Sequence, residues 1–451
     1  MSNVDYSGLT GEIVTKGDFE YEESIMAWNR AIQKYPLVII YCHNEEDVIN
    51  AIAWAKNNNI EIRVRSGAHS YEGYSTGNDV AVIDISKMNK IYIDEDKKIV
   101  KIEGGVRNRE IYEALGAKGY AFPGGGCPTV GVPGLVLGGG WGYSSRFLGL
   151  ACDSLVEAEL INYKGEKLLL NESSNSDLFW ACKGSGGGNF GIIVSMTIKI
   201  KEKIEMGTLI NINYPNVSIE DNIKIIEALQ NLYKTLDRRM NLKTAIYNSA
   251  YKGRGVKITG LFYGSYEEAL HILNPLRIIT DTMEFDLKYM TVLECNRWIQ
   301  DSHPDYEKYK STGRFVYRDY DVYEIKKIID LINNPADGSV YAAVSFYGAG
   351  GAISDIDKSS TAFYYRDAKF IMGLQSVWED DKYAEFNKDW IKKKFNIMRE
   401  LTEGSFLNFP LAELENYEQE YYGKNLKSLR KIKTKYDPYN IFNFPQVIKR
   451  E

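Results

Sequence analysis

The sequence predicts an α+β protein built from more than one domain. Amphipathic helices and short apolar strands alternate about every 15 to 20 residues in its N-terminal part. The chain has 451 residues, enough for roughly two or three domains with a substantial core. Glycine is concentrated, with 20 of the 39 glycines between Gly104 and Gly191. Because apolar strands run through that segment, it predicts a ligand cradle and not a flexible linker.

Helices and strands are predicted in order along the first 200 residues. Residues 44–59 place apolar side chains on one helical face, and Asn44 can cap this helix. A second helix is expected at 108–119, where it ends on glycine. Alternating or apolar runs predict strands at 60–65, 79–85, 97–105, 154–161 and 191–200.

The sequence pattern changes after about residue 203, where glycine becomes less frequent. Helical and strand patterns alternate beyond this point, at 220–236, 256–264, 322–333 and 339–348. They predict an antiparallel sheet covered by helices. A basic helix, a Tyr-Asp-Pro turn and a short tail close the chain at 421–448. The predicted divisions are a ligand-binding domain, a substrate domain and a C-terminal segment, at 1–203, 204–403 and 404–451.

Composition argues against several classes of protein. The net charge is only −6 without long runs of one sign, so we expect no nucleic-acid and no membrane partner. No apolar run approaches the ~20 residues that span a bilayer. The first residues are polar and acidic, unlike a signal peptide, which predicts a cytoplasmic location. The five cysteines form no CxxC and the four histidines no HExxH, so no metal site is expected.

One histidine and one cysteine stand in glycine-bearing loops. His69 lies in Arg-Ser-Gly-Ala-His-Ser-Tyr-Glu-Gly and Cys127 in Gly-Gly-Gly-Cys-Pro-Thr-Val-Gly. Without bulky side chains, the backbone of such loops can approach a large planar or phosphorylated ligand. A nucleophilic nitrogen and a nucleophilic sulfur in two such loops indicate that both bond to the same ligand.

The glycines at 186–191 match GxGxxG, but their context is wrong for a Rossmann fold. They follow a helical pattern and precede a strand, whereas the Rossmann order is strand, glycines, helix. No Gly-Lys-Ser/Thr is present either, which excludes a P-loop.

Several segments together resemble the berberine bridge enzyme-like flavoprotein oxidases of the vanillyl-alcohol oxidase superfamily. They are IRVRSGAHSYEGYSTG, FPGGGCPTVGVPGLVLGGGWGYSSRFLGLACDSLVEAELI, DLFWACKGSGGGNFGIIVS and KTKYDPYNIFNFPQ. The match covers the first 200 residues and the last 30, in order and with the family's spacing. It implies a PCMH-type FAD-binding domain of two subdomains. The family's cofactor is FAD, attached through a histidine to the flavin 8α-methyl and through a cysteine to C6; His69 and Cys127 match both.

The resemblance and the loop chemistry together predict the remaining cofactor contacts. Successive backbone N–H groups of loop 65–70 suit a pyrophosphate. Arg65 would add charge there or else pair with a carboxylate. Asn440 would cap the flavin or else be a plain turn residue. The predicted cofactor-binding residues besides His69 and Cys127 are Arg65, Ser66, Gly67, Ala68, Ser70, Val130, Gly131, Gly134, Gly140, Gly142, Ile193 and Asn440.

The chain departs from the family at one position. Many members continue CPTVGxGGH, whereas this chain has Leu135 in place of that last histidine. The imidazole that approaches the flavin N1–C2=O region is therefore missing. Pro133 also removes one backbone donor.

Tyrosines are the predicted bases, because no further histidine stands in a recognisable motif. Tyr421 and Tyr422 match a Tyr-Tyr-Gly-x-Asn motif that faces the flavin in the family, and one of them is preferred. Tyr347 matches a pocket-lining strand, and packing roles remain the alternative for all three. A phenol has a pKa of about 10, so as a base it needs a cation such as Arg366 or a paired tyrosine.

Val130 matches the family position that gates oxygen, which predicts an oxidase that forms hydrogen peroxide. The expected partners are a small-molecule alcohol, either a carbohydrate or a secondary metabolite, and O2. The alternatives are a dehydrogenase with another acceptor and a flavin-binding protein without turnover. The sequence does not indicate the substrate or the oligomeric state.

Overall fold

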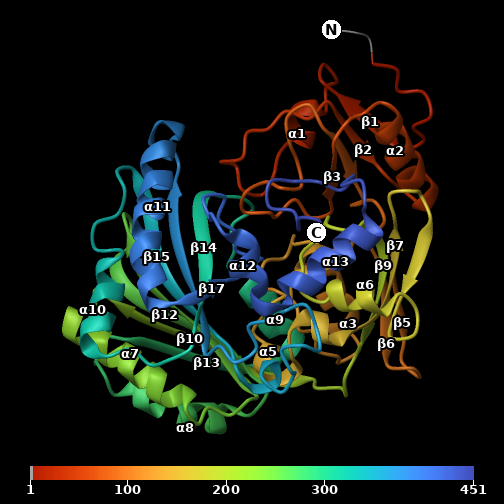
Figure 1. The fold of residues 1–451 in the computed structure, drawn as a ribbon. Helices are drawn as coiled ribbons and strands as arrows, with labels where there is room; N and C mark the ends of the chain where they lie inside the picture. The colour runs from red at the N-terminus through yellow and green to blue at the C-terminus, as the bar shows by residue number, and fades with distance from the viewer. Residues whose placement is uncertain (1–3) are drawn as a thin grey trace.

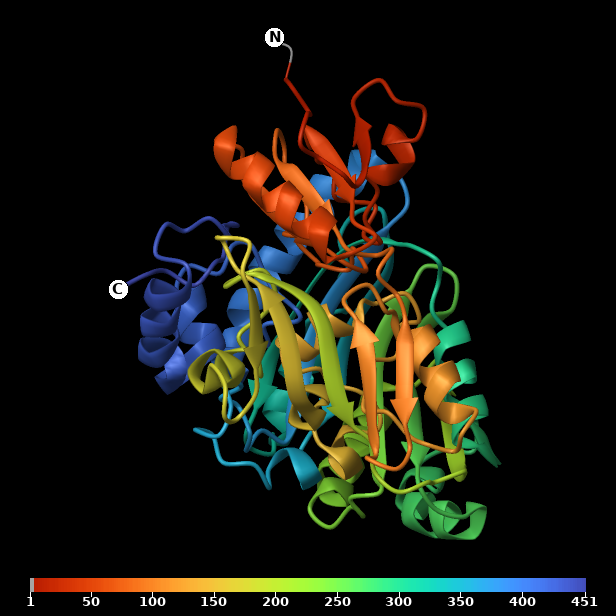
Figure 2. The ribbon, with the colours of Figure 1, turned by 90° about the vertical axis from the view of Figure 1, so that its right-hand side faces the viewer.

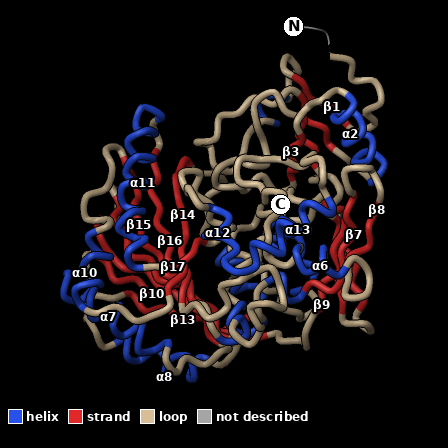
Figure 3. Tube along the Cα trace, in the orientation of Figure 1, coloured by secondary structure: helices blue, strands red, loops and turns tan. Residues whose placement is uncertain are grey.

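The computed structural model describes residues 4–451 and confirms the predicted α+β class. Three sheets of four, five and eight strands carry the fold (Figure 1). The strands of the four- and five-stranded sheets come from residues before 200. The strands of the eight-stranded sheet come from the segment between Met206 and Ser405. Figure 3 shows helices along the outer side of the large sheet and many loops between the sheets. Within residues 4–451, no helix is long and apolar enough to cross a membrane.

The four-stranded sheet has the order β1-β2-β4-β3 and lies at the N-terminal end of the molecule (Figure 1). β2 and β3 both pair with β4 in parallel, so their carboxyl ends lie at one edge, where the loop with His69 begins. The elements of this part are β1 (Glu12–Thr15), α1 (Tyr21–Ser24), β2 (Val38–Tyr41), α2 (Glu45–Asn57), β3 (Ile62–Arg65) and β4 (Ala81–Asp84).

The five-stranded sheet is antiparallel, with the order β5-β6-β9-β7-β8, and faces the viewer in Figure 2. The glycine-rich loops and short helices of residues 104–191 connect its strands. Its elements are β5 (Ile91–Asp94), β6 (Ile99–Glu103), α3 (Asn108–Gly116), α4 (Val132–Leu137), α5 (Ser145–Leu148), β7 (Leu155–Ile161), β8 (Lys167–Leu170), α6 (Ser176–Ala181) and β9 (Ile192–Lys199).

The eight-stranded sheet is antiparallel throughout, with the order β13-β10-β12-β11-β15-β16-β14-β17. α7, α8, α10 and α11 lie on its outer side, and the other two sheets lie beyond its inner side (Figure 1). Its strands are β10 (Met206–Pro215), β11 (Met240–Ser249), β12 (Gly253–Phe262), β13 (Glu284–Thr291), β14 (Lys308–Val316), β15 (Ser339–Gly348), β16 (Phe370–Trp378) and β17 (Glu403–Ser405). Its helices are α7 (Ile219–Tyr233), α8 (Tyr266–Arg277), α9 (Val292–Asp301), α10 (Val322–Asp330) and α11 (Ala384–Leu401).

Local sequence signals agree with the observed elements. The Asn44 side chain accepts a hydrogen bond from Asp47 N and caps α2, as predicted. α3 ends at Gly116, and Gly119 follows it with φ +80°, a conformation that glycine adopts freely. The glycines at 186–191 lie between α6 and β9, which confirms that they do not form a Rossmann turn.

The C-terminal segment returns to the N-terminal half of the molecule through α12 (Tyr417–Tyr422) and α13 (Leu426–Tyr436) (Figure 1). A fully buried ion pair, Lys433 to Asp437 at 2.7 Å, fixes the turn after α13. Lys433 Nζ also donates to the carbonyls of Asn189 and Phe442, at 2.7 and 2.8 Å. These bonds satisfy the buried charge and hold the chain after 440 against the glycine loop.

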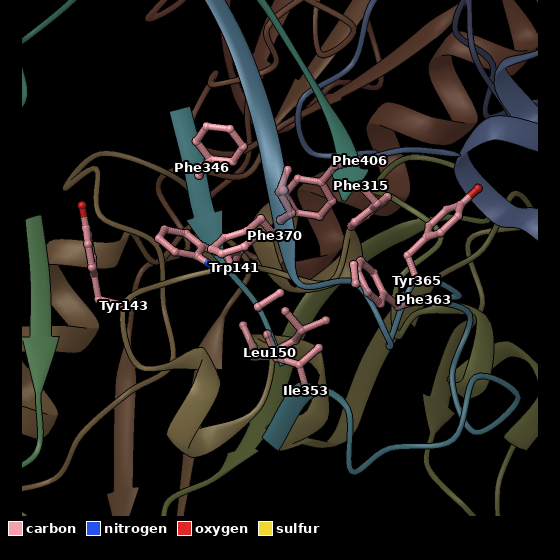
Figure 4. Close-up of a cluster of buried hydrophobic side chains, with 14 of the residues drawn as sticks. Trp141, Tyr143, Leu150, Phe315, Phe346, Ile353, Phe363, Tyr365, Phe370 and Phe406 are labelled. Atoms are coloured by element: carbon pink, nitrogen blue, oxygen red, sulfur yellow. The ribbon is translucent and has the colours of Figure 1, made fainter. Parts of the chain in front are cut away.

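A cluster of aromatic side chains joins the large sheet to the glycine-rich loops (Figure 4). Phe315 stacks on Tyr365 at 4.4 Å between ring centroids and meets Phe406 edge-on at 5.9 Å. Trp141 donates its indole N–H to Gly348 O at 2.7 Å. Each buried aromatic pair adds roughly 1 kcal/mol beyond its area, so this cluster holds the two parts in a fixed relation.

Candidate functional site

One cavity of about 610 Å³ lies between the three sheets. This is the usual size of a cofactor or ligand site. The cavity brings together most of the predicted site residues: Ser66, Gly67, Ala68, His69, Ser70, Cys127, Val130, Gly131, Gly134, Ile193 and Tyr347.

Thr129 links the two predicted attachment residues. Its hydroxyl is hydrogen-bonded to His69 Nε2 at 2.7 Å and lies 4.0 Å from Cys127 Sγ. Trp28 stacks on the imidazole with ring centroids 5.2 Å apart. The two loops, 58 positions apart in the chain, thus present nitrogen and sulfur side by side on one wall.

Both nucleophiles are uncharged in this environment. Burial, aided by the positive charge of Arg107 and by His303, lowers the pKa of His69 to about 3. The imidazole is therefore neutral at physiological pH and retains a lone pair. Burial also raises the pKa of the Cys127 thiol, although hydrogen bonds with Thr129 act in the opposite direction.

Glycines shape the backbone at this end of the cavity. A Cβ on Gly67 would lie 2.2 Å from Gly131 N, so the two loops can touch only through glycine. A Cβ on Gly134 would meet nothing within 4 Å. Ala68 has φ +56°, a left-handed conformation that costs an ordinary residue roughly 1–2 kcal/mol. Such strain is typical of a site where a ligand fixes the backbone.

The cavity residues fit a dinucleotide with a large planar ring. Three cavity-lining polar atoms are buried without a hydrogen-bond partner within residues 4–451: Trp28 Nε1, Arg63 Nε and Tyr74 Oη. Buried polar groups normally have partners, so these three atoms are suited to contact the polar groups of a ligand. The glycine-bounded wall and the two neutral nucleophiles add the space and the chemistry for a flavin.

The far end of the cavity is the inner face of the eight-stranded sheet. Lys243 on β11 places its ammonium 5.1 Å from the ring centroid of Tyr347 on β15. Burial tends to lower the pKa of Lys243, but the phenols of Tyr347, Tyr143 and Tyr341 outweigh it and raise this pKa. Lys243 is thus a fixed cation beside a predicted base.

The sequence did not indicate Lys243 or His303 as site residues. His303 lines the cavity, and its Nδ1 lies 2.9 Å from Ile299 O, which assigns the proton to Nδ1 and leaves Nε2 as an acceptor. Burial, aided by Lys243, lowers the pKa of His303 to about 4. Neither residue lies in a recognisable motif, because strand pairing and the turn after α9 bring them to the cavity.

The two tyrosines preferred as bases from the sequence lie outside the cavity lining. Tyr421 is 4% exposed and donates to Gln446 Oε1 at 2.8 Å. Tyr422 is fully buried and donates to Ser185 O at 3.0 Å. Both pack the C-terminal helices. The C-terminal segment lines the cavity at residues 407–410, which include Phe409, and again at Phe442, Asn443, Phe444 and Gln446.

Four predicted cofactor contacts also lie outside the lining. Arg65 forms a buried ion pair with Asp84, which was the alternative prediction. Gly140 and Gly142 allow close packing of loops, since a Cβ on Gly142 would lie 1.8 Å from Gly124 O. Asn440 has φ +54° and is a turn residue, again the alternative. The predicted cation partner Arg366 is bound to Asp153, with Nη2 to Oδ1 at 2.7 Å.

The comparisons with known proteins agree with this cavity. The family model described as FAD binding domain matches residues 36–170, and that described as berberine and berberine like matches 405–449. The FAD-linked oxidoreductase YvdP of Bacillus subtilis is 34% identical over 98% of this chain and 98% of its own. This chain therefore belongs to the berberine bridge enzyme-like family of FAD-linked oxidoreductases.

Solved structures show the same fold. BBE-like 1 from Physcomitrella patens is 24% identical with a TM-score of 0.90 and covers 98% of both chains. Carbohydrate oxidase from Microdochium nivale, in complex with a substrate analogue, is 22% identical with a TM-score of 0.89, over 99% of this chain and 98% of its own. The PCMH-type α+β fold predicted from the sequence is thereby confirmed. The relative from Bacillus subtilis and the FAD-binding family model show that the protein is an FAD-linked oxidoreductase.

Proposed function

We propose that this protein is an FAD-dependent oxidase that takes hydride from an alcohol-type substrate and passes the electrons to O2, forming hydrogen peroxide. FAD would be held through both His69 and Cys127. The supporting observation is that one cavity has both nucleophiles on one wall and the Lys243–Tyr347 pair on the facing sheet.

His69 and Cys127 would attach and orient the cofactor. The neutral imidazole has its Nε2 hydrogen-bonded to Thr129, which leaves Nδ1 as the nitrogen available to attack. FAD, when bound, supplies the hydride acceptor. The orphaned polar atoms Arg63 Nε and Tyr74 Oη would contact its polar groups.

Tyr347 would take the substrate hydroxyl proton. The Lys243 ammonium beside its ring would stabilise a phenolate oxygen, which is the form of this side chain that can accept the proton. Phe409 packs against Tyr347 with centroids 5.2 Å apart and stacks on Tyr71 at 5.2 Å, which excludes water from this side. The alcohol would bind between Tyr347 and the flavin, as the family resemblance implies.

Val130 supports oxygen as the electron acceptor. It lines the cavity between the attachment residue Cys127 and Gly131, and its own side chain is small. The alternative is a dehydrogenase that uses another acceptor. A carbohydrate is one expected substrate class, in keeping with the fold shared with the carbohydrate oxidase.

The test is a panel of sugars and aromatic alcohols with two readouts. Anaerobic mixing follows the loss of flavin absorbance, and mixing the reduced protein with air follows its return together with peroxide. Reduction with rapid reoxidation and one peroxide per substrate supports the oxidase. Reduction followed by slow reoxidation in air would identify the dehydrogenase instead.

A further inference from the structure

The cavity face of the large sheet carries two lysines on neighbouring strands. In the register of β11 and β12, Lys243 lies opposite Thr259, and Ala245 lies opposite Lys257. The two lysines are therefore diagonal neighbours on one face, with Cα atoms roughly 7–8 Å apart. All four residues line the cavity.

Neither lysine forms an ion pair with a carboxylate among residues 4–451. Lys243 Nζ lies 5.1 Å from the ring centroid of Tyr347. Lys257 Nζ lies 5.9 Å from the ring centroid of Trp298. Lys257 is exposed and Lys243 is half-buried, so both ammonium groups are open to an anion that enters the cavity.

One carboxyl group, that of Glu307, also lines this wall. Burial raises its pKa, while the Lys243 ammonium and the hydrogen bond that Gln375 Nε2 donates to Oε2 at 3.3 Å act in the opposite direction. Glu307 forms no ion pair with either lysine among residues 4–451. His303 is neutral because burial lowers its pKa to about 4. The phenols of Tyr143 and Tyr341 are neutral too, since burial raises their pKa values to about 12.

Small residues leave room between the lysines. Ala245 and Ser345 lie next to each other across β11 and β15, and Thr259 lies beside Lys243. Ser345 and Thr259 also line the cavity. Two ammonium groups and two hydroxyls thus lie along one part of the cavity wall, a set of donors suited to a carboxylate.

We propose that the substrate of this enzyme carries a carboxylate, bound by Lys257 together with Lys243 on the inner face of β11 and β12. This inference rests on the proposed oxidase function and adds the substrate class. The carboxylate would set the substrate's orientation, while Tyr347, opposite Lys243 in the β11–β15 register, would meet the hydroxyl to be oxidised. The carboxylate could belong to a sugar acid or to an aromatic acid.

Two isosteric pairs of probes test this proposal: D-glucuronate against D-glucuronamide, and 4-(hydroxymethyl)benzoate against 4-(hydroxymethyl)benzamide. Each is titrated anaerobically into the purified full-length protein, with tryptophan fluorescence as the readout because Trp28 and Trp141 line the cavity. The variants are Lys257→Met and, as a control of equal charge change, Lys326→Met on the outer helix α10. The flavin is reduced with dithionite beforehand, so no hydride can be transferred and the binding result is independent of whether the protein is an oxidase.

The expected result is that the carboxylate of at least one pair binds roughly 10- to 100-fold more tightly than its amide, the range for a charge-assisted hydrogen bond. This advantage should fall to about threefold or less in Lys257→Met and persist in Lys326→Met. The pair that shows it identifies the sugar or the aromatic acid. Equal binding of acid and amide in both pairs, or an advantage that survives in Lys257→Met, would overturn the proposal.

Discussion

The two ends of the cavity are built on different principles. At the attachment end, two loops supply contiguous residues, glycines bring them together, and Thr129 joins His69 to Cys127. At the sheet end, single residues arrive from separate strands, such as Lys243 from β11 and Tyr347 from β15. The attachment end holds neutral nucleophiles, whereas the sheet end holds unpaired cations and phenols. The first arrangement suits covalent attachment and the second suits proton transfer and substrate recognition.

The largest effect is expected when the phenol oxygen of Tyr347, at the sheet end, is removed. Tyr347→Phe should slow anaerobic flavin reduction by roughly 10²-fold or more, the scale of a general base. Tyr422→Phe is the matched control, since its hydroxyl donates to Ser185 O and neither residue lines the cavity. Stopped-flow absorbance measures both rates. A Tyr347→Phe protein that is reduced as fast as wild type would remove Tyr347 from the mechanism.

Acid should weaken the fold through His303, a neutral group of the sheet end. Its folded pKa of about 4 lies below the usual 6.5, so the unfolded chain binds a proton first as pH falls. The stability it contributes is present above about pH 6.5 and is lost between there and pH 4. Between pH 7 and 5, the loss reaches about 2 kcal/mol. Urea unfolding of wild type and His303→Gln should show a smaller pH dependence in the variant; equal dependence would contradict this.

Val130 belongs to the attachment end and should affect oxygen without affecting substrate. Val130→Leu adds a methylene that narrows the space beside Cys127, and we expect reoxidation in air to slow roughly tenfold, about 1.4 kcal/mol in the barrier. Anaerobic reduction by substrate should stay within about twofold. Val130→Ala serves as the opposite control. If reoxidation is equally fast in all three proteins, Val130 does not control oxygen access.

Thr129 should influence the rate of attachment more than its final extent. Thr129→Val keeps the shape but removes the hydrogen bond to His69 Nε2, worth about 1 kcal/mol. Attachment of added FAD to flavin-free protein should slow by roughly fivefold, while Thr129→Ser should behave like wild type. The flavin retained after acid precipitation at successive times gives the rate. Indistinguishable time courses for Val and wild type would show that Thr129 does not orient the imidazole.

Sequence reasoning succeeded where function depends on contiguous residues. The α+β class, the cap of α2 and the loop residues around His69 and Cys127 could all be predicted, because each depends on neighbours in the chain. It failed at the sheet end. The Tyr-Tyr-Gly-x-Asn motif suggested Tyr421 and Tyr422, but packing of α12 turns both phenols into the core. Strand register brings Lys243 and Lys257 to one face of the sheet, and the turn after α9 brings His303 to the cavity. No local sequence pattern indicates these placements.

The most direct test of the account is the intact mass of the denatured protein, because the attachment end has meaning only if both loops hold one FAD. Wild type, His69→Ala and Cys127→Ala should each carry the added mass of one FAD. The double variant His69→Ala/Cys127→Ala should have the mass of the polypeptide alone and release its flavin on acid precipitation. Wild-type protein at the mass of the bare polypeptide, with all flavin in the acid supernatant, would contradict the account.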